Sequence, residues 1–424
     1  MAWDNVGENA PWVNEAISNQ IVASKRLALA SIGKAAAVFG EDWTPQNREW
    51  VKRSAFTYAR ELTSLAKATA STSKERRDLT RRVLQSSAGR TCVLIHAASK
   101  RGLTLTRSGL EKLSSEIWPW KDCGEAVRVC LKEKPDGTHR PTVDLGVRRL
   151  ALSYLAGHVL RAIWGVAPDE FNRRGKGTHA AVGFLMRAIE NDRPWAFTAD
   201  VKDFYPSIRH EVVKKFVPLP ENVISNCILI PEGVKLIVPP GYGDSEATRD
   251  TLRRGIPQGS PTSDLVASQL LGMLLEPIAF DTMCARYSDN IFGACDTRED
   301  AEATLLALSE RLRTHPAGEL TLHKQTVTHS DKGVHLLGYL VTTNANQERY
   351  EARAFPSPSS CSRWLSELPS RLTMQSIDAR QDEAIALTLE WLRCWRSSDP
   401  SCDWIDRLLT RAIVVASEPT DELS

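Results

Sequence analysis

Two aspartates at the ends of apolar runs are the residues of this chain best suited to metal-dependent chemistry. Asp289 lies in the polar tip of residues 286–293, where flanking apolar residues predict a hairpin. Asp200 ends the apolar run at residues 197–199, and a turn is expected at Pro206. A two-metal phosphoryl-transfer site needs carboxylates placed in this way, because one Mg²⁺ can activate a hydroxyl group while the other holds the leaving pyrophosphate.

A third segment, residues 254–263, lies between the two aspartates and contains two glycines, two prolines and Gln258. It predicts a tight turn before a helix at residues 262–275. The three segments, in this order, resemble motifs A, B and C of reverse transcriptases, most closely those of the bacterial lineage of group II introns, retrons and defence-associated enzymes. The resemblance implies an α+β fold of the right-hand polymerase type, with fingers, a palm built on an antiparallel sheet and a helical thumb.

The resemblance and the residue pattern divide the chain into three expected parts. These are a helical N-terminal extension with a basic patch at residues 1–120, fingers and palm at residues 121–345, and a helical thumb at residues 346–424. The thumb is expected to be helical because apolar stripes at helical spacing follow residue 350. Residues 217–254 are rich in proline and glycine and are predicted to be a loop excursion. The extension is either an RNA-holding surface or a structural cap on the fingers.

The resemblance also assigns a metal site, with Asp200, Asp289 and Asn290 as the candidate catalytic residues. Asp200 would bridge two Mg²⁺ ions (or Mn²⁺ as a substitute), with the carbonyl of Val201 as an added ligand and Asp289 as the second carboxylate. The family usually has a second aspartate where this chain has Asn290, and an amide coordinates Mg²⁺ more weakly than a carboxylate. Two hypotheses follow: an active enzyme with a lean metal site, which the retained motifs favour, or a degenerate, non-catalytic palm.

Basic side chains on a predicted hairpin are the first candidates for nucleotide binding. Residues 126–131 alternate as a strand, a turn follows, and a second strand starts at Arg140. In the family such a hairpin folds over the incoming nucleotide and clamps its triphosphate. Arg140 and either Lys132 or Lys134 would fill this role, because arginine offers a bidentate fork and lysine a compact charge.

Five further residues are candidates for contacts with the nucleotide. Tyr205 corresponds to the family's steric gate, an aromatic ring that excludes a 2′-hydroxyl; the alternative is that Phe204 and Tyr205 belong to the palm core. Asp203 is expected to act in positioning, and Gln258 could hydrogen-bond the nucleotide or the template. Lys324 could protonate the departing pyrophosphate or be a surface lysine, because one extra residue displaces it from the family's usual Lys-Thr pair.

Two basic regions and one glycine are candidates for contacts with nucleic acid. Residues 71–107 hold nine lysines and arginines against two acids, so this patch can neutralise phosphates, although most such runs form a solvated helix face. The loop at residues 171–179 resembles the family's second motif, which grips the template backbone. Residues 334–340 resemble the primer-grip hairpin. The candidate residues are Arg76, Arg77, Arg81, Arg82, Arg173, Arg174, Lys176 and Gly338.

Composition indicates an ordinary globular protein in a reducing compartment. The 424 residues are 42% hydrophobic and 25% charged, with a net charge of +2, so composition alone does not suggest a nucleic-acid partner. No apolar run is long enough to span a bilayer and the N-terminus lacks a signal-peptide pattern, so we expect a cytoplasmic protein without a membrane partner. Nine cysteines without a C-x-x-C pair fit buried thiols better than disulfides or zinc.

The resemblance implies an RNA-directed DNA polymerase of the bacterial defence-associated kind. Such enzymes resemble this chain in their small size, their extended N-terminus and their lack of an endonuclease. Its expected partners are dNTPs, a structured noncoding RNA as template and scaffold, and the cDNA product; the oligomeric state stays open. Two alternatives are template-independent DNA synthesis, as in abortive-infection relatives, and a catalytically dead RNA-binding scaffold. A retron or intron-type enzyme also fits.

Overall fold

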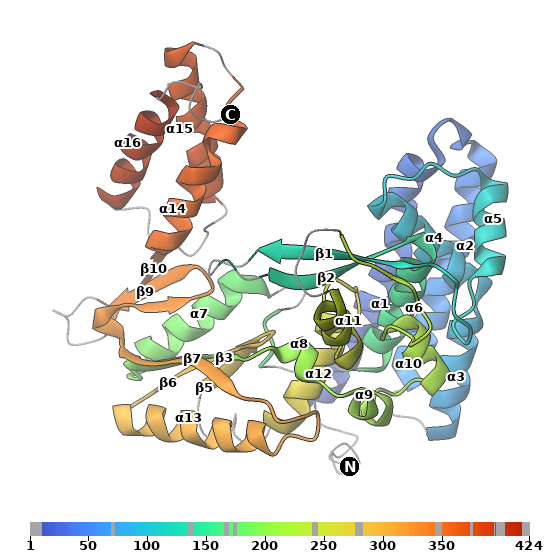
Figure 1. Ribbon diagram of the computed structural model, residues 1–424, viewed down its shortest axis with the longest axis horizontal. Helices are drawn as coiled ribbons and strands as arrows, with labels where there is room; N and C mark the ends of the chain where they lie inside the picture. The colour runs from blue at the N-terminus through green and yellow to red at the C-terminus, as the bar shows by residue number, and fades with distance from the viewer. Residues whose placement is uncertain are drawn as a thin grey trace. The chain divides into compact units, whose positions relative to one another are not determined.

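The protein, seen here as a computed structural model, consists of two compact units whose elements are labelled in Figure 1. The first unit comprises residues 1–167, 203–273 and 314–320, and the second comprises residues 168–202, 274–313 and 321–424. The structure describes residues 11–68, 73–133, 137, 139–164, 169–172, 176–239, 245–275, 283–343, 350–373, 376–393, 395 and 403–417.

Most of the first unit is helical. Its described helices are α1 (Pro11–Phe39), α2 (Pro45–Lys67), α3 (Ser73–Gln85), α4 (Ser87–Lys100), α5 (Arg107–Glu116), α6 (Val147–Ile163), α8 (Phe204–Ser207), α9 (His210–Phe216), α10 (Glu221–Cys227), α11 (Ser245–Arg254) and α12 (Ser263–Leu275). The hydroxyls of Thr44 and Ser86 cap α2 and α4 by accepting hydrogen bonds from backbone N–H groups of the first turn. Residues 91–98 of α4 are all buried, and α4 packs against α1, α2 and α6, so it forms the centre of a helical bundle.

A three-stranded sheet in the first unit carries the predicted basic hairpin. β1 (Val127–Glu133) pairs antiparallel with β2 (His139–Leu145) and parallel with β4 (Leu236–Ile237). Along β1 the buried residues Val127 and Val129 alternate with exposed ones, as the sequence pattern predicts. The predicted hairpin is therefore confirmed.

The expectation that residues 217–254 form a loop is wrong. This segment contains α10, β4 and α11. Val223, Ile224 and Cys227 are buried at helical spacing and hold α10 against the unit. Pro220 lies directly before α10, and proline is tolerated at the start of a helix. The number of prolines in the segment therefore concealed the helical pattern.

The second unit is built on an antiparallel sheet in the order β5-β6-β3-β7, which confirms the predicted sheet. Its strands are β3 (Trp195–Val201), β5 (Met283–Tyr287), β6 (Asn290–Cys295) and β7 (Leu322–His329). The helices α7 (Gly177–Glu190) and α13 (Arg298–Arg313) cover its two faces (Figure 1). Ala196 and Phe292 pack in one core cluster with α7, and alternation along β3 places Asp200 on the same face of the sheet.

The rest of the second unit is a small sheet followed by helices. The strands β8 (Val334–Leu336), β9 (Tyr339–Thr343) and β10 (Ala352–Pro356) pair antiparallel, and α14 (Pro358–Glu367), α15 (Ile377–Arg393) and α16 (Asp403–Ser417) follow. The chain after residue 350 is therefore not wholly helical, because β10 pairs with β9 before the predicted helices begin. Trp364 is buried and stacks on Trp391 with ring centroids 5.3 Å apart, so it belongs to the helical core, as expected.

The cysteines in the described part of the chain are free thiols. Cys92, Cys227, Cys284 and Cys295 are buried, as predicted, whereas Cys130 is exposed. Burial raises the pKa of Cys92 and of Cys284 to about 12, so both stay protonated and unreactive at neutral pH.

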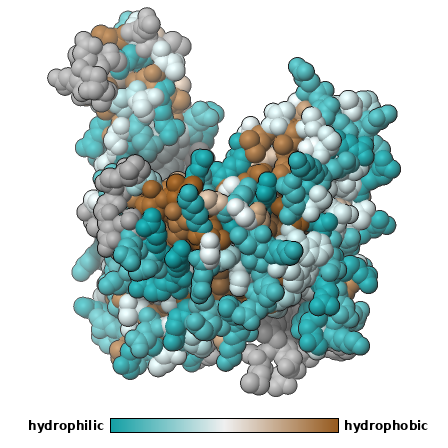
Figure 2. Space-filling view, turned by 45° about the vertical axis from the view of Figure 1, so that its right-hand side comes forward, coloured by the Kyte–Doolittle hydropathy of each residue, from teal (hydrophilic) through white to brown (hydrophobic). Residues whose placement is uncertain are grey.

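Hydrophilic side chains cover most of the face drawn in Figure 2, and apolar ones gather in a few patches. Across the described residues, the helices are all too short or too polar to cross a bilayer. The predicted mixture of helices and sheets is confirmed, and the assignment of the three parts as extension, fingers with palm, and thumb stays a prediction.

Candidate active site

The turn that carries Asp289 is as short as a hairpin allows. β5 and β6 pair with Tyr287 opposite Asn290, which leaves Ser288 and Asp289 as a two-residue loop. Ser288 has a φ of 58°, in the left-handed region that the first central residue of such a turn adopts. The predicted hairpin with a polar tip is therefore confirmed, and its short loop fixes the point at which Asp289 leaves the sheet.

Asp200 lies beside this turn. In the register of β3 and β6 it is directly opposite Asn290, and the Val201 N–H donates a hydrogen bond to the carbonyl oxygen of Asp289 at 3.0 Å. Directly opposite residues in an antiparallel pair have Cα atoms about 5 Å apart. The strand register therefore brings the two aspartates to one edge of the sheet.

These two carboxylates fit a divalent cation that binds together with a nucleotide. Mg²⁺ is commonly held by one or two protein carboxylates plus substrate phosphates and water, rather than by a cage of protein ligands. Over the described residues, no group of three or more histidines, cysteines, aspartates and glutamates gathers as a metal site. Two carboxylates at one sheet edge are a donor set of the kind that Mg²⁺ shares with substrate phosphates.

Asn290 contacts the turn that carries Asp289 without adding charge to it. Its Nδ2 donates a hydrogen bond to Asp289 Oδ1 at 3.2 Å. The amide thus restrains one carboxylate oxygen of Asp289, whereas an aspartate here would repel it. The replacement lowers the negative charge of the site and leaves Asp289 oriented.

Lys324 reaches Asp200 because β7 contains a bulge. The pairing of β3 with β7 shifts register between Thr198 and Asp200, and Lys324 has a left-handed φ of 49° at this point. The bulge absorbs the extra residue that displaces the lysine from its usual place. Lys324 Nζ lies 3.7 Å from Asp200 Oδ2, although 74% of the lysine side chain is exposed. The lysine is therefore both at the surface and beside Asp200, and its function as a proton donor stays a prediction.

Two of the predicted clamp residues share one face of their hairpin. Lys132 and Arg140 are both exposed and lie directly opposite each other on β1 and β2. Like charges in this arrangement repel each other, so an anion bound between them is stabilising. Lys134 lies outside the described residues.

The first unit resumes at Asp203, and the two aromatic residues that follow differ in their surroundings. Asp203 is exposed and has a φ of 43° just before α8, where its carbonyl oxygen accepts the Ser207 N–H. Phe204 is 3% exposed, so it belongs to the core. For this residue the core alternative given above holds. Tyr205 is half-buried, and its hydroxyl donates a hydrogen bond to Asp264 Oδ1 at 3.0 Å.

The turn before α12 packs so closely that only glycine fits at two positions. A Cβ atom on Gly255 would lie 2.2 Å from the Tyr205 carbonyl oxygen, and one on Gly259 would lie 2.6 Å from the Val143 carbonyl oxygen. Gln258 is half-buried, and its carbonyl oxygen accepts the Val143 N–H at 2.7 Å. The turn is therefore fixed against both α8 and β2.

Residues 133–341 match the family model described as reverse transcriptase (RNA-dependent DNA polymerase). The protein is a reverse transcriptase. The match spans Asp200, Gln258 and Asp289, and it implies a polymerase-type fold, a nucleic-acid template, dNTP substrates and divalent metal ions. A search of curated proteins finds no significant match.

The predicted template loop of the reverse transcriptase is described in part. Arg173 and Arg174 lie outside the described residues, whereas Lys176 Nζ lies 4.0 Å from the centroid of the Phe171 ring. Gly338, in the turn between β8 and β9, has a φ of 86°, and its carbonyl oxygen accepts the Ser357 N–H just before α14. The predicted hairpin is confirmed, and its function as a primer grip stays a prediction.

The basic patch of the reverse transcriptase separates into two groups. Arg77, Arg81 and Arg82 on α3 are exposed and Arg76 is half-buried, so the predicted nucleic-acid candidates face solvent. Arg101 forms an ion pair with Asp144 at 2.5 Å within the unit.

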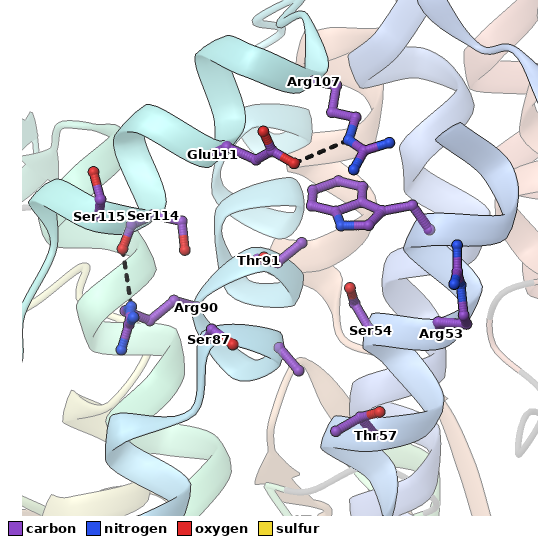
Figure 3. A pocket seen from close by; sticks show the side chains of 12 residues that line it. Arg53, Ser54, Thr57, Ser87, Arg90, Thr91, Arg107, Glu111, Ser114 and Ser115 are labelled. Atoms are coloured by element: carbon purple, nitrogen blue, oxygen red, sulfur yellow. Dashed lines mark hydrogen bonds and ion pairs between the residues drawn. The ribbon is translucent and has the colours of Figure 1, made fainter. Parts of the chain in front are cut away.

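Arg90 and Arg107, by contrast, line a hollow of about 650 Å³ formed by α2, α4 and α5 (Figure 3). The Arg90 Nε donates to the Ser114 carbonyl oxygen at 2.9 Å, while Arg107 stacks over Trp50 and pairs with Glu111. Through these contacts the two guanidinium groups join the three helices.

Sequence reasoning missed three acidic residues that hold the candidate site. Asp169 and Glu170 pair with Arg286, on the strand that leads into the turn of Asp289, and Asp264 accepts the Tyr205 hydroxyl. Arg286 was the available signal, since an arginine that follows the apolar residues 283–285 in a strand needs a carboxylate partner when it is buried. The spacing of these acids in the chain gives no such signal.

Proposed function

We propose that this reverse transcriptase copies a structured noncoding RNA into cDNA by two-metal phosphoryl transfer, as part of a bacterial antiphage defence. The observation that carries the chemistry is the register of β3, β6 and the turn between β5 and β6, which puts Asp200 and Asp289 at one sheet edge. The defence role and the RNA partner are supported by the resemblance to defence-associated enzymes.

Asp200 and Asp289 would hold two Mg²⁺ ions, or Mn²⁺ in their place, with the Val201 carbonyl as a further ligand. The ions supply activation of the primer hydroxyl and charge stabilisation of the leaving pyrophosphate. Lys324, whose Nζ lies 3.7 Å from Asp200 Oδ2, would give a proton to that leaving group. With Asn290 the site has one carboxylate fewer than usual, so we expect an active enzyme that needs more Mg²⁺ for full rate.

Binding of the nucleotide is proposed for residues of the first unit. Lys132 and Arg140 would bind the triphosphate as a pair of opposed cations, with Lys134 as the alternative lysine. Tyr205 would exclude ribonucleotides, Asp203 would position the segment after β3, and Gln258 would contact the nucleotide or template base.

Binding of nucleic acid is proposed for the exposed arginines of α3 together with the loop that holds Arg173, Arg174 and Lys176. Each arginine on α3 that neutralises a phosphate releases counterions, so RNA affinity would fall steeply with salt. Gly338 would let the primer strand approach the backbone closely. We propose the cytoplasm as the site of action.

The test is to identify the nucleic acid that the enzyme carries and makes. The chain is purified from cells that carry its own genomic locus, with and without RNase treatment, and the bound RNA and DNA are sequenced. A discrete structured RNA whose sequence reappears in the DNA supports the proposal, and this DNA should be absent from an Asp289→Ala preparation.

The alternatives give different outcomes. DNA made after complete RNA removal would replace the proposal with template-independent synthesis. No DNA with any template, in Mg²⁺ or Mn²⁺, would replace it with a non-catalytic scaffold.

A further inference from the structure

We propose that Glu170 is a positioning residue that holds the catalytic turn and joins it to the predicted template loop, with Arg286 and Asp169 as its supports. This inference rests on the proposed use of Asp289 as a metal ligand. Every residue that it needs belongs to the second unit.

The segment from Asp169 to Phe171 runs beside β5 and joins it through one isolated bridge, outside the four strands of the sheet. The Arg286 N–H donates to the Asp169 carbonyl oxygen at 2.8 Å, and the Phe171 N–H donates to the Arg286 carbonyl oxygen at 2.8 Å. These two bonds make a parallel bridge between Glu170 and Arg286. The backbone therefore fixes this segment immediately before the catalytic turn.

Arg286 makes this attachment ionic as well. Its side chain is 1% exposed, its Nε lies 2.6 Å from Asp169 Oδ2, and its Nη1 lies 3.6 Å from Glu170 Oε2. The Glu170 side chain is 8% exposed. Charges this well buried are tolerated when they are paired, and removing one of them leaves the others uncompensated. The ion pairs therefore keep Glu170 in a fixed position.

The other oxygen of Glu170 reaches the turn itself. Oε1 accepts the Ser288 N–H at 3.3 Å and the Asn172 N–H at 2.7 Å. Ser288 has the left-handed φ of 58° and directly precedes Asp289. One carboxylate thus restrains both the turn that presents Asp289 and Asn172 of the predicted template loop.

This arrangement predicts a loss of metal binding and turnover rather than of nucleotide binding. Outer partners that orient a metal ligand typically change metal affinity or activity 10- to 100-fold when they are removed. We expect Glu170→Ala to weaken Mn²⁺ binding and to lower kcat by about 10- to 100-fold. The KM for dNTP should stay within about twofold, because the triphosphate is bound by other residues. Glu170→Gln keeps an oxygen that can accept the Ser288 N–H, so its losses should be about threefold, smaller than those of Glu170→Ala.

The experiment measures three quantities on the full chain. Mn²⁺ affinity is measured by electron paramagnetic resonance without nucleotide, kcat and KM by primer extension, and exposure of the turn by hydrogen exchange at residues 286–290. Arg149→Met is the matched control, because Arg149 is a buried arginine of the first unit that pairs with Asp122 at 2.7 Å. Arg149→Met should lose about as much stability as Glu170→Ala. Its hydrogen exchange at residues 286–290, its Mn²⁺ affinity and its kcat should stay at the wild-type values.

Faster exchange at Ser288 together with weaker Mn²⁺ binding in Glu170→Ala supports the proposal. A folded Glu170→Ala variant with wild-type exchange, Mn²⁺ affinity and kcat overturns it. If the alanine variant does not fold, wild-type values for all three quantities in Glu170→Gln overturn it instead. Absence of DNA synthesis by the wild-type protein would refute the proposed function, whereas the exchange measurement would still decide the function of Glu170.

Discussion

At the scale of single residues, Tyr205 shows how a side chain with a proposed specificity function is held. Its ring is half-buried and its hydroxyl donates to Asp264 on α12 at 3.0 Å. A hydrogen bond of this kind contributes about 1 kcal/mol. If the ring excludes a 2′-hydroxyl, the bond to Asp264 keeps it in the position where it does so.

Asp264→Ala is therefore expected to weaken selection against ribonucleotides. The ratio of kcat/KM for dNTP over rNTP should fall about fivefold, which corresponds to about 1 kcal/mol. Tyr205→Phe should cause a similar fall, and the double variant should fall no further, because both changes remove one bond. An unchanged ratio in both single variants, or additive effects in the double variant, would contradict this function of Asp264.

Residue-level prediction from the sequence succeeds where the chemistry is carried by a local motif. Asp200 and Asp289 could be identified as candidate metal ligands, because the apolar runs beside them predict that each lies at a strand end. The contact of Lys324 with Asp200 could not, because it depends on a left-handed residue in a bulge. Glu170 could not be found either, because its partners Arg286 and Ser288 are distant in sequence and no motif spacing links them to it.

At the scale of elements, the turn before α12 depends on the absence of a side chain. Gly255 lies against the backbone of Tyr205 and Pro206, whose nearest atoms would be 2.2 and 2.4 Å from a Cβ atom. The Ile256 N–H also donates to the Tyr205 carbonyl oxygen at 2.9 Å. The glycine thus keeps the Tyr205 segment and the turn in contact.

Gly255→Ala should destabilise the protein by about 2 kcal/mol, since backbone atoms cannot move aside as a flexible side chain does. Gly33→Ala is the matched control: it lies within α1, nothing lies within 4 Å of its added Cβ, and it should stabilise the helix by about 1 kcal/mol. Urea denaturation measures both. Equal stability of the Gly255 variant and the wild type would contradict the close packing.

Elements were predictable where the hydrophobic period was regular. The β1–β2 hairpin, the β5–β6 hairpin and the helices of the N-terminal extension follow their patterns. α10, α11 and β4 were missed because prolines and glycines at element ends outweighed short apolar patterns between them. β10 was missed because its pairing with β9 depends on the fold of the whole unit.

At the scale of the whole molecule, stability depends on neutral histidines inside the first unit. His96 is 5% exposed and His158 is 2% exposed, at the centre of the helical bundle. Burial, with added repulsion from Lys34, lowers the pKa of His96 to about 4 from 6.5. Burial also lowers the pKa of His158 well below 6.5 and that of His315 to about 4.

The free energy of unfolding should therefore fall as the pH drops from about 6.5 to about 4. In this window the unfolded chain binds protons that the folded histidines do not, which favours unfolding by up to about 1.4 kcal/mol per pH unit for each histidine. Urea denaturation at several pH values measures how steeply the free energy of unfolding changes with pH. His96→Asn should reduce this slope by the contribution of one histidine. A stability that stays constant across the window would contradict the neutral state of these residues.

The class of the protein and the reverse transcriptase domain could be inferred from the sequence at this scale, since three ordered motifs carry them. The division into two units could not, because the boundary lies directly after Lys202, within the segment that resembles motif A. The boundaries after residues 120 and 345 rest on motif positions and remain predictions.

The central claim is that Asp200 and Asp289 together hold the ions that drive nucleotide addition, and single-nucleotide primer extension tests it most directly. Asp200→Asn and Asp289→Asn should each lower the rate in Mg²⁺ by at least about a hundredfold, because each removes a charge that no other group replaces. Asp192→Asn, which changes an exposed residue just before the other end of β3, should keep the wild-type rate. A folded Asp200 or Asp289 variant that adds nucleotides at the wild-type rate would contradict the account.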